Sequence, residues 1–304
     1  MSRELIELSD ALAQATKSAA ASAVAVHTES RGSSSGVIWR PGIVVTAEHA
    51  LRRDEEIQLT LPDGRVVSAE LAGRDPSTDI AVLKCPEVAL GAAKFANVEA
   101  LEPGSLSLVV GRTRASGPVA ALAVVSLVAP ERRTWTGGSL APYIRLDVGL
   151  QPTAAGGAVV DAAGRIVGIA TPRFARFGAI VIPAPLLNRV MDTLLEKGRI
   201  PRGYLGVGLQ TVRLPEALRN ALQRKEKTAA ILLEVEPDGP AHKAGLVIGD
   251  ILVALGGETV ARFEDVQSYL QGENIGKSLA AKIVRGGAVV EVSIVVSDRP
   301  HGEN

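Results

Sequence analysis

The feature that most constrains the fold is a series of short apolar runs separated by turns, between about residues 24 and 183. The turns contain Arg40-Pro41-Gly42, Pro62-Asp63-Gly64, Glu102-Pro103-Gly104 and Ala163-Gly164. Short strands at this spacing are typical of an all-β barrel or sandwich. Because 46% of the residues are apolar but only 3% are aromatic, the cores must be built from aliphatic side chains. We therefore predict a mostly β body.

Two helices are predicted to flank this body. Ser2–Ala25 carries apolar residues at helical spacing along one face and is expected to pack on the body or on a neighbouring subunit. Those residues are Leu5, Leu8, Leu12 and Ala15. The second helix, Pro185–Lys197, is followed directly by Gly198, a residue that commonly ends helices.

A second domain is predicted after a short basic linker, residues 199–203. Residues 204–300 alternate strand-like and helix-like runs, which indicates an α+β unit with its own core. Its expected strands and helices are Tyr204–Leu209, Pro215–Arg224, Ala230–Val235, His242–Gly245, Ile251–Leu255, Phe263–Gln271, Ala280–Val284 and Val289–Val296. The full division is a helical segment at 1–24, a β domain at 25–198, the linker, and the second domain at 204–300.

Composition excludes several classes of function. The formal net charge is zero, which argues against a nucleic-acid partner bound by phosphate neutralisation. Uncharged apolar stretches are too short to predict a membrane span. A single cysteine, Cys85, can form neither an intramolecular disulfide nor a zinc cluster, so we expect a small, half-buried structural residue at a strand end, no metal and no cofactor.

The first residues lack the pattern of a signal peptide. Glu4, Glu7 and Asp10 interrupt the region where a continuous apolar run would be needed. As written, the chain is expected to be cytoplasmic. If it is a trimmed piece of an exported protein, the expectation changes to the periplasm.

Three segments carry residues that suit nucleophilic catalysis. The first, Gly42–His49, is a strand that ends on a histidine; the second, Asp75–Lys84, contains Asp79; the third is Gln151–Asp161. A serine protease needs a base held by a carboxylate, and a nucleophile beside paired backbone N–H donors. The order His49, Asp79 and position 155 is that of chymotrypsin-like enzymes.

The same segments resemble the HtrA/DegP family of serine proteases. That family shows T-x-x-H at the histidine, D-x-x-T-D-[IL]-A-[VL]-[LI]-K at the aspartate and P-G-N-S-G-G-[PA]-[LV]-[VI] at the serine. The resemblance runs from about Val24 to Pro300 and implies a chymotrypsin-like double β-barrel followed by one PDZ domain. It also implies that His49 holds the base position and Asp79 the orienting carboxylate. The remaining histidines, His27, His242 and His301, match no motif and are expected to be structural or solvated.

The third segment departs from the family pattern. Aligning Pro152 and Gly156 with the motif puts Thr153 on its first glycine and Ala155 on the nucleophilic serine. Ala155 has no hydroxyl, so no acyl-enzyme can form there. Thr153 is β-branched and disfavours positive φ, so we predict that the oxyanion hole of Thr153 and Ala155 is unformed. Neither Thr153 nor Ser139 stands at the motif position as a substitute nucleophile.

The second domain resembles HtrA PDZ domains in two places. Tyr204-Leu205-Gly206-Val207 resembles their carboxylate-binding loop, and Pro240–Leu246 with Gly249–Leu252 resembles S-P-A-x-x-A-G-L-x-x-G-D-x-[IL]. The resemblance implies that a peptide adds as a strand to an open sheet edge while loop N–H groups capture its C-terminal carboxylate. The segment Phe263–Gln271 would form the other wall of the groove.

Four apolar residues are expected beside the substrate in the protease body. They are Ala179, Ile180, Val181 and Ile182. Their size suggests a small aliphatic primary pocket, in a cleft that still accepts extended segments without cutting them.

Two functions fit these residues. The first is an HtrA-like pseudoprotease that binds unfolded or C-terminal peptide segments of client proteins, as a chaperone, adaptor or regulatory subunit in protein quality control. The alternative is a genuine HtrA-type serine endopeptidase whose serine was changed to Ala155. A laboratory change would not also install Thr153, which favours the first. The resemblance implies a homo-oligomer, commonly a trimer, although the aromatic residues expected in the N-terminal segment are absent.

Overall fold

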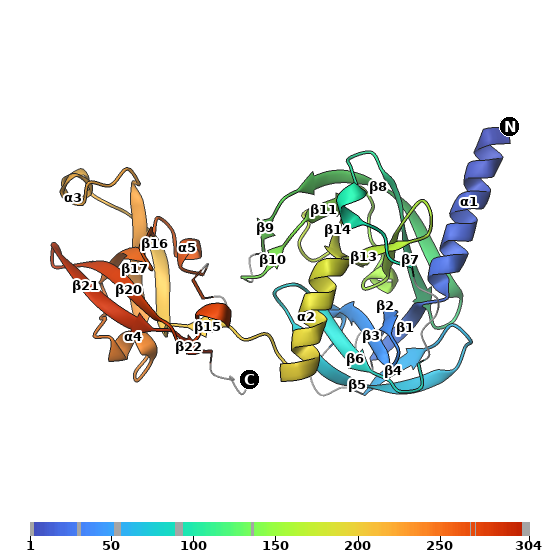
Figure 1. Cartoon of the computed structure of the whole chain (residues 1–304), viewed down its shortest axis with the longest axis horizontal. Helices are drawn as coiled ribbons and strands as arrows, with labels where there is room; N and C mark the ends of the chain where they lie inside the picture. The colour runs from blue at the N-terminus through green and yellow to red at the C-terminus, as the bar shows by residue number, and fades with distance from the viewer. Residues whose placement is uncertain are drawn as a thin grey trace. The chain divides into compact units, whose positions relative to one another are not determined.

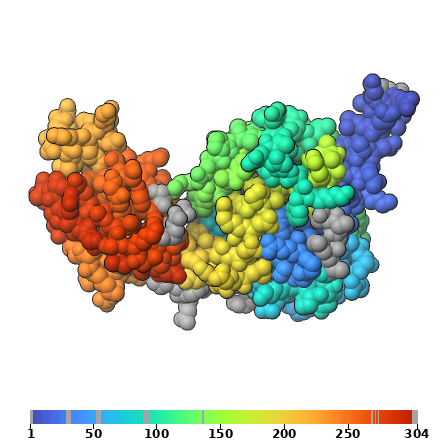
Figure 2. All heavy atoms as spheres, in the orientation of Figure 1, coloured from blue at the N-terminus to red at the C-terminus, as the bar shows by residue number. Residues whose placement is uncertain are grey.

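The computed structural model describes residues 3–28, 32–51, 56–88, 94–134, 137–267, 269–270 and 272–299. The chain divides into two compact units, Met1–Ile200 and Pro201–Asn304, which are described separately (Figures 1 and 2). The boundary falls inside the predicted linker.

The first unit is built on two closed antiparallel β-barrels, each of six strands within the described residues. The first barrel has the order β1-β2-β3-β6-β5-β4, with β1 at Ala23–Thr28, β2 at Gly32–Arg40, β3 at Ile43–Ala47, β4 at Ile57–Thr60, β5 at Val66–Asp75 and β6 at Ile80–Lys84. The second has the order β11-β14-β13-β12-β7-β8, with β7 at Leu106–Thr113, β8 at Gly117–Ala129, β11 at Tyr143–Leu146, β12 at Ala158–Asp161, β13 at Ile166–Thr171 and β14 at Ala179–Pro183. A short ribbon pairs β9, Arg132–Arg133, with β10, Ser139–Leu140.

Turn chemistry and aliphatic burial explain why this segment forms barrels. Gly42 and Gly64 have φ angles of +73° and +88°, a region that favours glycine, and each lies in the turn between two paired strands. The buried strand positions are mainly Val, Leu, Ile and Ala, as the low aromatic content predicts. The predicted chymotrypsin-like double barrel is confirmed.

Helix α1, Arg3–Ala20, packs its C-terminal half against the second barrel. Ala15 and Ala19 are buried there, whereas Leu5 and Leu8 near its start are exposed, and Figure 1 shows this end projecting from the barrels. The sequence predicts a helix as far as Ala25, which is wrong at its end. Residues from Ala23 onward leave the helix because their β-branched side chains are buried in strand β1.

Helix α2, Ala184–Lys197, contacts β5 and β6 of the first barrel and β13 and β14 of the second. Its Leu187, Met191 and Leu194 are fully buried. Gly198 ends it with a φ of +70° and donates its N–H to the Leu194 carbonyl at 2.8 Å. This helix closely matches its prediction.

The second unit is an antiparallel sheet in the order β16-β17-β18-β20-β21, with β19 beside β18 and a separate pair β15-β22. Its strands are β15 Gly203–Tyr204, β16 Val207–Arg213, β17 Thr228–Val235, β18 Ile251–Leu255, β19 Glu258–Thr259, β20 Ser278–Arg285, β21 Ala288–Val295 and β22 Ser297–Asp298; its helices are α3 Glu216–Ala221, α4 Pro240–Lys243 and α5 Phe263–Gln267. The single predicted strand Tyr204–Leu209 is divided, because Gly206 turns the chain with a φ of +70°.

No helix in the described ranges is long and apolar enough to cross a membrane.

Candidate functional site

Strand pairing brings His49 and Asp79 together. His49 lies in a 3₁₀ turn directly after β3, and Asp79 directly precedes β6, which pairs with β3. The His49 Nδ1 atom lies 2.8 Å from Asp79 Oδ2, and the His49 backbone N–H donates to Asp79 Oδ1 at 2.9 Å. Asp79 is fully buried, so its two oxygens hold the histidine ring and its backbone in one orientation.

Thr171 is a third member of this cluster that sequence reasoning missed. It ends β13 in the second barrel, is fully buried, and its hydroxyl donates to Asp79 Oδ2. The only sequence signal was its place at the end of the apolar run that follows Gly168. The Asp79 carboxylate is therefore bound by groups from both barrels.

The third predicted segment forms a tight loop, residues 151–157. Pro152–Ala154 make a 3₁₀ turn, and the Ala155 N–H donates to the Pro152 carbonyl at 3.2 Å. An oxyanion hole needs backbone N–H groups aimed at the point where charge develops. The Ala155 N–H is instead used inside the loop, where Thr153 takes part in the turn.

The 151–157 loop lies against the elements that carry the His49–Asp79 pair. Gly156 donates its N–H to the carbonyl of Ala170, the neighbour of Thr171, at 2.8 Å. A methyl group on Gly156 would lie 2.8 Å from the backbone nitrogen of Ala47, at the end of β3. Gly156, the neighbour of Ala155, thus contacts β3, which leads to His49, and β13, which ends at Thr171. Ala155 itself is buried.

Ser35, on β2 of the first barrel, holds the loop in this form. Its hydroxyl donates to the Thr153 carbonyl at 2.6 Å and accepts the Arg112 N–H at 2.9 Å. Its backbone N–H donates to the Ala155 carbonyl at 2.9 Å. Two carbonyls of the loop are therefore fixed by one residue of the opposite barrel.

A buried acid lies beside this cluster. The Glu48 carboxylate lies 3.1 Å from Arg173 Nη1 and 3.6 Å from Arg74 Nη1, and the same Arg173 atom lies 3.9 Å from Asp79 Oδ1. Burial raises the pKa of Glu48, and the Asp79 charge raises it further, while Arg173, Arg74 and His49 oppose that rise. Sequence reasoning attached no role to Glu48, Arg74 or Arg173.

The strand expected beside the substrate is β14. All its residues are buried between β11 and β13, where their side chains fill two core clusters, one inside the second barrel and one shared with the first barrel and both helices. These residues include Ala179, Ile180, Val181 and Ile182. In this conformation none of them presents its side chain to solvent.

The other residues singled out by the sequence lie in local contacts. Cys85 is buried, and burial raises the pKa of its thiol. Ser139 donates its hydroxyl to a glutamate, Glu131, and His27 is bonded to a threonine hydroxyl at 2.8 Å. The His242 Nδ1 atom accepts a backbone N–H at 3.1 Å. His301 lies outside the described residues, within which no cluster of His, Cys, Asp and Glu side chains suits a metal ion.

In the second unit, the 204–207 loop is anchored through its carbonyls. The Leu205 carbonyl accepts the Ala241 N–H at 2.9 Å, and the Gly206 carbonyl accepts the Glu236 N–H at 2.8 Å. Gly206 combines its positive φ with a close approach, since a methyl group there would lie 3.2 Å from a Glu236 carboxylate oxygen. The loop is thus fixed to the segment that leads into α4.

Strand β16 lies at the edge of the sheet, and among the described strands it pairs with β17 alone. Helix α5 contacts β16, and the Phe263 N–H donates to the Thr211 hydroxyl at 3.4 Å. A strand edge beside a helix, with a turn of backbone at its start, is the geometry that accepts an added peptide strand.

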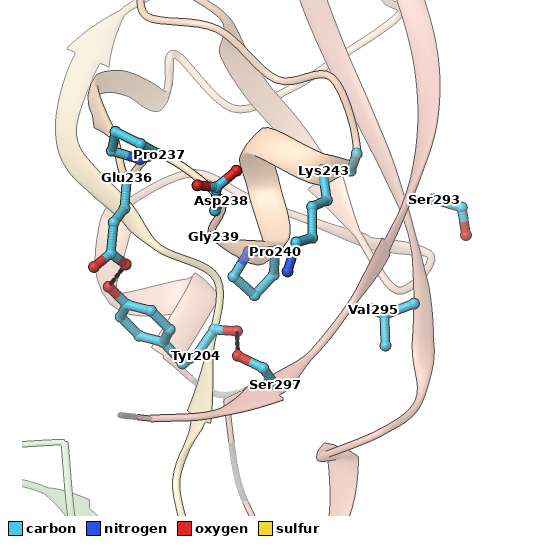
Figure 3. Close-up of a pocket in the computed structure, with 11 residues that line it drawn as sticks. Tyr204, Glu236, Pro237, Asp238, Gly239, Pro240, Lys243, Ser293, Val295 and Ser297 are labelled. Carbon is cyan, nitrogen blue, oxygen red and sulfur yellow. Dashed lines mark hydrogen bonds between the residues drawn. The ribbon is translucent and has the colours of Figure 1, made fainter. Parts of the chain in front are cut away.

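A pocket of about 460 Å³ lies beside Tyr204, the first residue of the 204–207 loop (Figure 3). Tyr204, Pro240 of α4 and Val295 of β21 line it, and the Tyr204 hydroxyl donates to the Glu236 carboxylate. That hydrogen bond raises the pKa of Tyr204. The bond also ties the first residue of the loop to the segment that holds its carbonyls.

Comparison with known proteins gives the same two domains. Residues 34–169 match the model of the trypsin-like peptidase domain, and residues 231–285 match the model of the PDZ domain. Two relatives, from Halomonas elongata and Chlamydia pneumoniae, are both named probable periplasmic serine endoprotease DegP-like. Each is 29% identical to this chain, and the matches cover 91% and 85% of this chain, respectively.

The chain spans 59% and 53% of the length of these two relatives. A solved structure of the HtrA-type protease AlgW with a decapeptide is 25% identical, with a TM-score of 0.76 over 95% of this chain and 99% of that one. Fold, domain order and sequence similarity agree: the chain has a trypsin-like peptidase domain followed by a PDZ domain, and it is similar to HtrA/DegP-type proteins.

Proposed function

We propose that this chain is a pseudoprotease that binds unfolded or C-terminal peptide segments without cleaving them, in a chaperone, adaptor or regulatory role. The observation that carries the proposal is at residue 155. Alanine stands there without a hydroxyl, in a loop whose Gly156 bonds to the carbonyl of Ala170, the neighbour of Thr171, and the Ala155 N–H is bonded to the Pro152 carbonyl within the loop.

On this proposal, the chain lacks two parts of the catalytic machinery: the nucleophile and one donor of the oxyanion hole. Without a hydroxyl at position 155, His49 has no nucleophile to activate. With the Ala155 N–H directed at the Pro152 carbonyl, a developing oxyanion would lack one of its donors, a loss worth about 10² to 10³ in rate in serine proteases. Losing both in one loop supports an inactive chain more strongly than either loss would alone.

Peptide binding is proposed for the PDZ domain. The edge strand β16, the neighbouring α5 and the anchored 204–207 loop support strand addition with capture of a terminal carboxylate. The similar AlgW structure contains a decapeptide. A homo-oligomer remains a prediction from the family resemblance, and sedimentation equilibrium would test it.

The second candidate is a serine endopeptidase altered at position 155. The observation in its favour is the arrangement of His49, Asp79 and Thr171, which suits a working base. The similar curated proteins are also named as proteases.

Restoring the hydroxyl separates the two candidates. We expect Ala155→Ser to leave casein uncut, because the backbone N–H of residue 155 would still donate to the Pro152 carbonyl. Adding Thr153→Gly is expected to release cleavage, since glycine permits the backbone rotation that threonine opposes. Peptide release from labelled casein measures both variants. Robust cleavage by Ala155→Ser alone would overturn the pseudoprotease proposal.

Carboxylate capture is tested with one peptide in two forms. A C-terminal aliphatic peptide with a free carboxylate is expected to bind at least about tenfold more tightly than its amidated form, a difference of about 1.4 kcal/mol. Fluorescence anisotropy measures both affinities on the full chain. Equal affinities would rule out the loop as a carboxylate site.

A further inference from the structure

We propose that the outer edge of β21, with the pocket beside it, is a second peptide site of the PDZ domain, which takes an extended segment carrying a lysine or arginine side chain. The inference rests on the proposed peptide-binding function and extends it, because this site needs no C-terminal carboxylate. One PDZ domain would then hold an internal segment of a client protein as well as a chain end.

The outer edge of β21 offers backbone groups to an added strand. β21 is the last strand of the sheet, and among the described strands it pairs with β20 alone. Directly after it, the Val296 N–H donates to the Lys277 carbonyl at 3.0 Å, and the Val296 carbonyl accepts the Gly276 N–H at 2.8 Å. Val296 thus directs its backbone groups toward the β20 side. Because successive residues of a strand direct these groups to opposite sides, Val295 and Ser293 direct theirs away from β20.

Strand β15 already pairs with the next stretch of the same edge. Tyr204 pairs in antiparallel register with Ser297, which lies two residues after Val295 and directs its backbone to the same side. At Gly206 the chain turns away with a φ of +70°. β15 therefore ends before it reaches Val295, and a peptide strand running antiparallel to β21 would continue the line of β15.

The pocket of about 460 Å³ lies at these positions of the edge (Figure 3). Ser293 and Val295 line it from the strand, and Pro240 and Ala244 line it from α4 and the residue after α4. The Ser293 hydroxyl is bonded to the Ser278 hydroxyl at 2.6 Å, so this residue has its backbone to offer to a ligand. A pocket of this size beside an open strand edge suits an extended peptide segment.

The pocket is acidic near Tyr204. Glu236 and Asp238 line this part, and the Glu236 carboxylate accepts the Tyr204 hydroxyl. Within the described residues, the Asp238 carboxylate and the Lys243 ammonium that lines the pocket have no hydrogen bond or ion pair. Arg299 lies near this end, with its guanidinium 5.8 Å from the centre of the Tyr204 ring, but it does not line the pocket. Two carboxylates against one ammonium favour a basic side chain on the added strand.

Peptides without charged ends test this site separately from carboxylate capture. The probe is a short acetylated and amidated peptide of valine and threonine with one lysine near its start, and the comparison peptide has glutamate in place of the lysine. We expect the lysine peptide to bind the full chain at least about tenfold more tightly than the glutamate peptide. Fluorescence anisotropy measures both affinities. A free-acid aliphatic peptide should not displace the lysine peptide, because it occupies β16.

Proline substitutions on the strand edge provide a variant and its control. Val295→Pro removes the N–H that faces the added strand and leaves the pairing with β20 in place, as proline at an outward edge position does. It is expected to lower the affinity for the lysine peptide at least about tenfold. Val289→Pro is the matched control, because Val289 directs its backbone to the same side but does not line the pocket. The control should bind both the lysine peptide and the free-acid peptide as the wild type does.

Two charge variants have expected effects of opposite sign. Asp238→Asn should weaken binding of the lysine peptide about threefold, and Lys243→Gln should strengthen it about threefold, since exposed charges contribute modestly. Asparagine also tolerates the φ of +60° at position 238. In NMR spectra of the full chain, the amide signals of Ser293 and Val295 should shift on addition of the lysine peptide, while that of Thr211 on β16 stays unchanged.

Several results would overturn the second site. They are equal binding of the lysine and glutamate peptides, equal losses in Val295→Pro and Val289→Pro, and displacement of the lysine peptide by the free-acid peptide. Self-association of the chain that Val295→Pro abolishes, without binding of the lysine peptide, would assign the edge to a second copy instead. Failure of the free-acid peptide to bind would refute carboxylate capture by the 204–207 loop, while the lysine peptide still reports the β21 edge.

Discussion

Gly156 is the residue at which the 151–157 loop is pressed most closely against the first barrel. Its φ is +78°, and a methyl group there would clash with the Ser35 carbonyl and lie 2.7 Å from the Thr46 hydroxyl oxygen. Backbone strain and backbone contact therefore both demand glycine.

We expect Gly156→Ala to destabilise the trypsin-like domain by more than about 3 kcal/mol, because it adds a clash with backbone to an unfavourable φ. Gly117→Ala separates the two causes, since Gly117 has the same φ of +78° with open space around it. That control should cost about 1 kcal/mol. Urea unfolding measures both; equal losses would show that the contact with Ser35 does not matter.

The residues around position 155 differ in how far sequence could find them. His49 and Asp79 can be predicted from the sequence because each lies in a recognisable sequence motif at the end of a predicted strand. Thr171, Ser35 and Arg173 were missed because their partners lie 92, 118 and 125 residues away, and no local pattern marks such contacts. Thr153 was singled out for its side chain, but the hydrogen bond between Ala155 and Pro152 is a property of the whole loop.

At the scale of elements, one arginine ties α1 to the barrels. The Arg112 side chain donates to the Ala23 carbonyl at 2.7 Å and to the Ala20 carbonyl at 3.2 Å, at the end of α1 and the start of β1. Burial lowers the pKa of Arg112. This contact is a second reason why the helix ends before Ala25, besides the burial of the β1 side chains: the Ala20 carbonyl is bound by a side chain 92 residues away, which no local pattern marks.

Arg112→Met is expected to loosen α1. The substitution keeps apolar bulk but leaves two carbonyls without their charged donor, which should lower the free energy of unfolding by about 2 to 3 kcal/mol. Hydrogen exchange should rise first in the last turn of α1. Arg114→Met is the control, because Arg114 is exposed and close in sequence. Similar exchange in both variants would contradict the role of Arg112.

At the scale of the molecule, each unit contains a buried carboxylate with a shifted pKa, and the two shifts have opposite directions. In the PDZ domain, Asp250 accepts two bonds from Arg285, both at 2.7 Å, and one from the Val247 N–H at 2.9 Å. Burial alone would raise the pKa of Asp250, but these donors outweigh it and the pKa is lowered. The pKa of Glu48 in the other unit is raised.

The lowered pKa makes the PDZ domain lose stability in acid. The stabilising contribution of Asp250 is present above the unfolded-state pKa of about 4 and is lost as pH falls through the lower folded-state pKa. Asp250→Asn should remove this part of the pH dependence and lower stability at neutral pH by about 2 kcal/mol. Calorimetry of the full chain between neutral and acidic pH follows the PDZ transition. An unchanged pH profile in Asp250→Asn would contradict the assignment.

Ser35 joins β2 of the first barrel to β7 and the 151–157 loop of the second through three hydrogen bonds. The loop therefore helps to hold the two barrels of the trypsin-like domain together. Building an oxyanion hole would require the Pro152 peptide to rotate, which would disturb the turn whose carbonyls are bonded to Ser35. Any gain in catalysis would therefore weaken the contact between the two barrels. Selection for a firm domain and selection for hydrolysis would therefore pull this one loop in opposite directions.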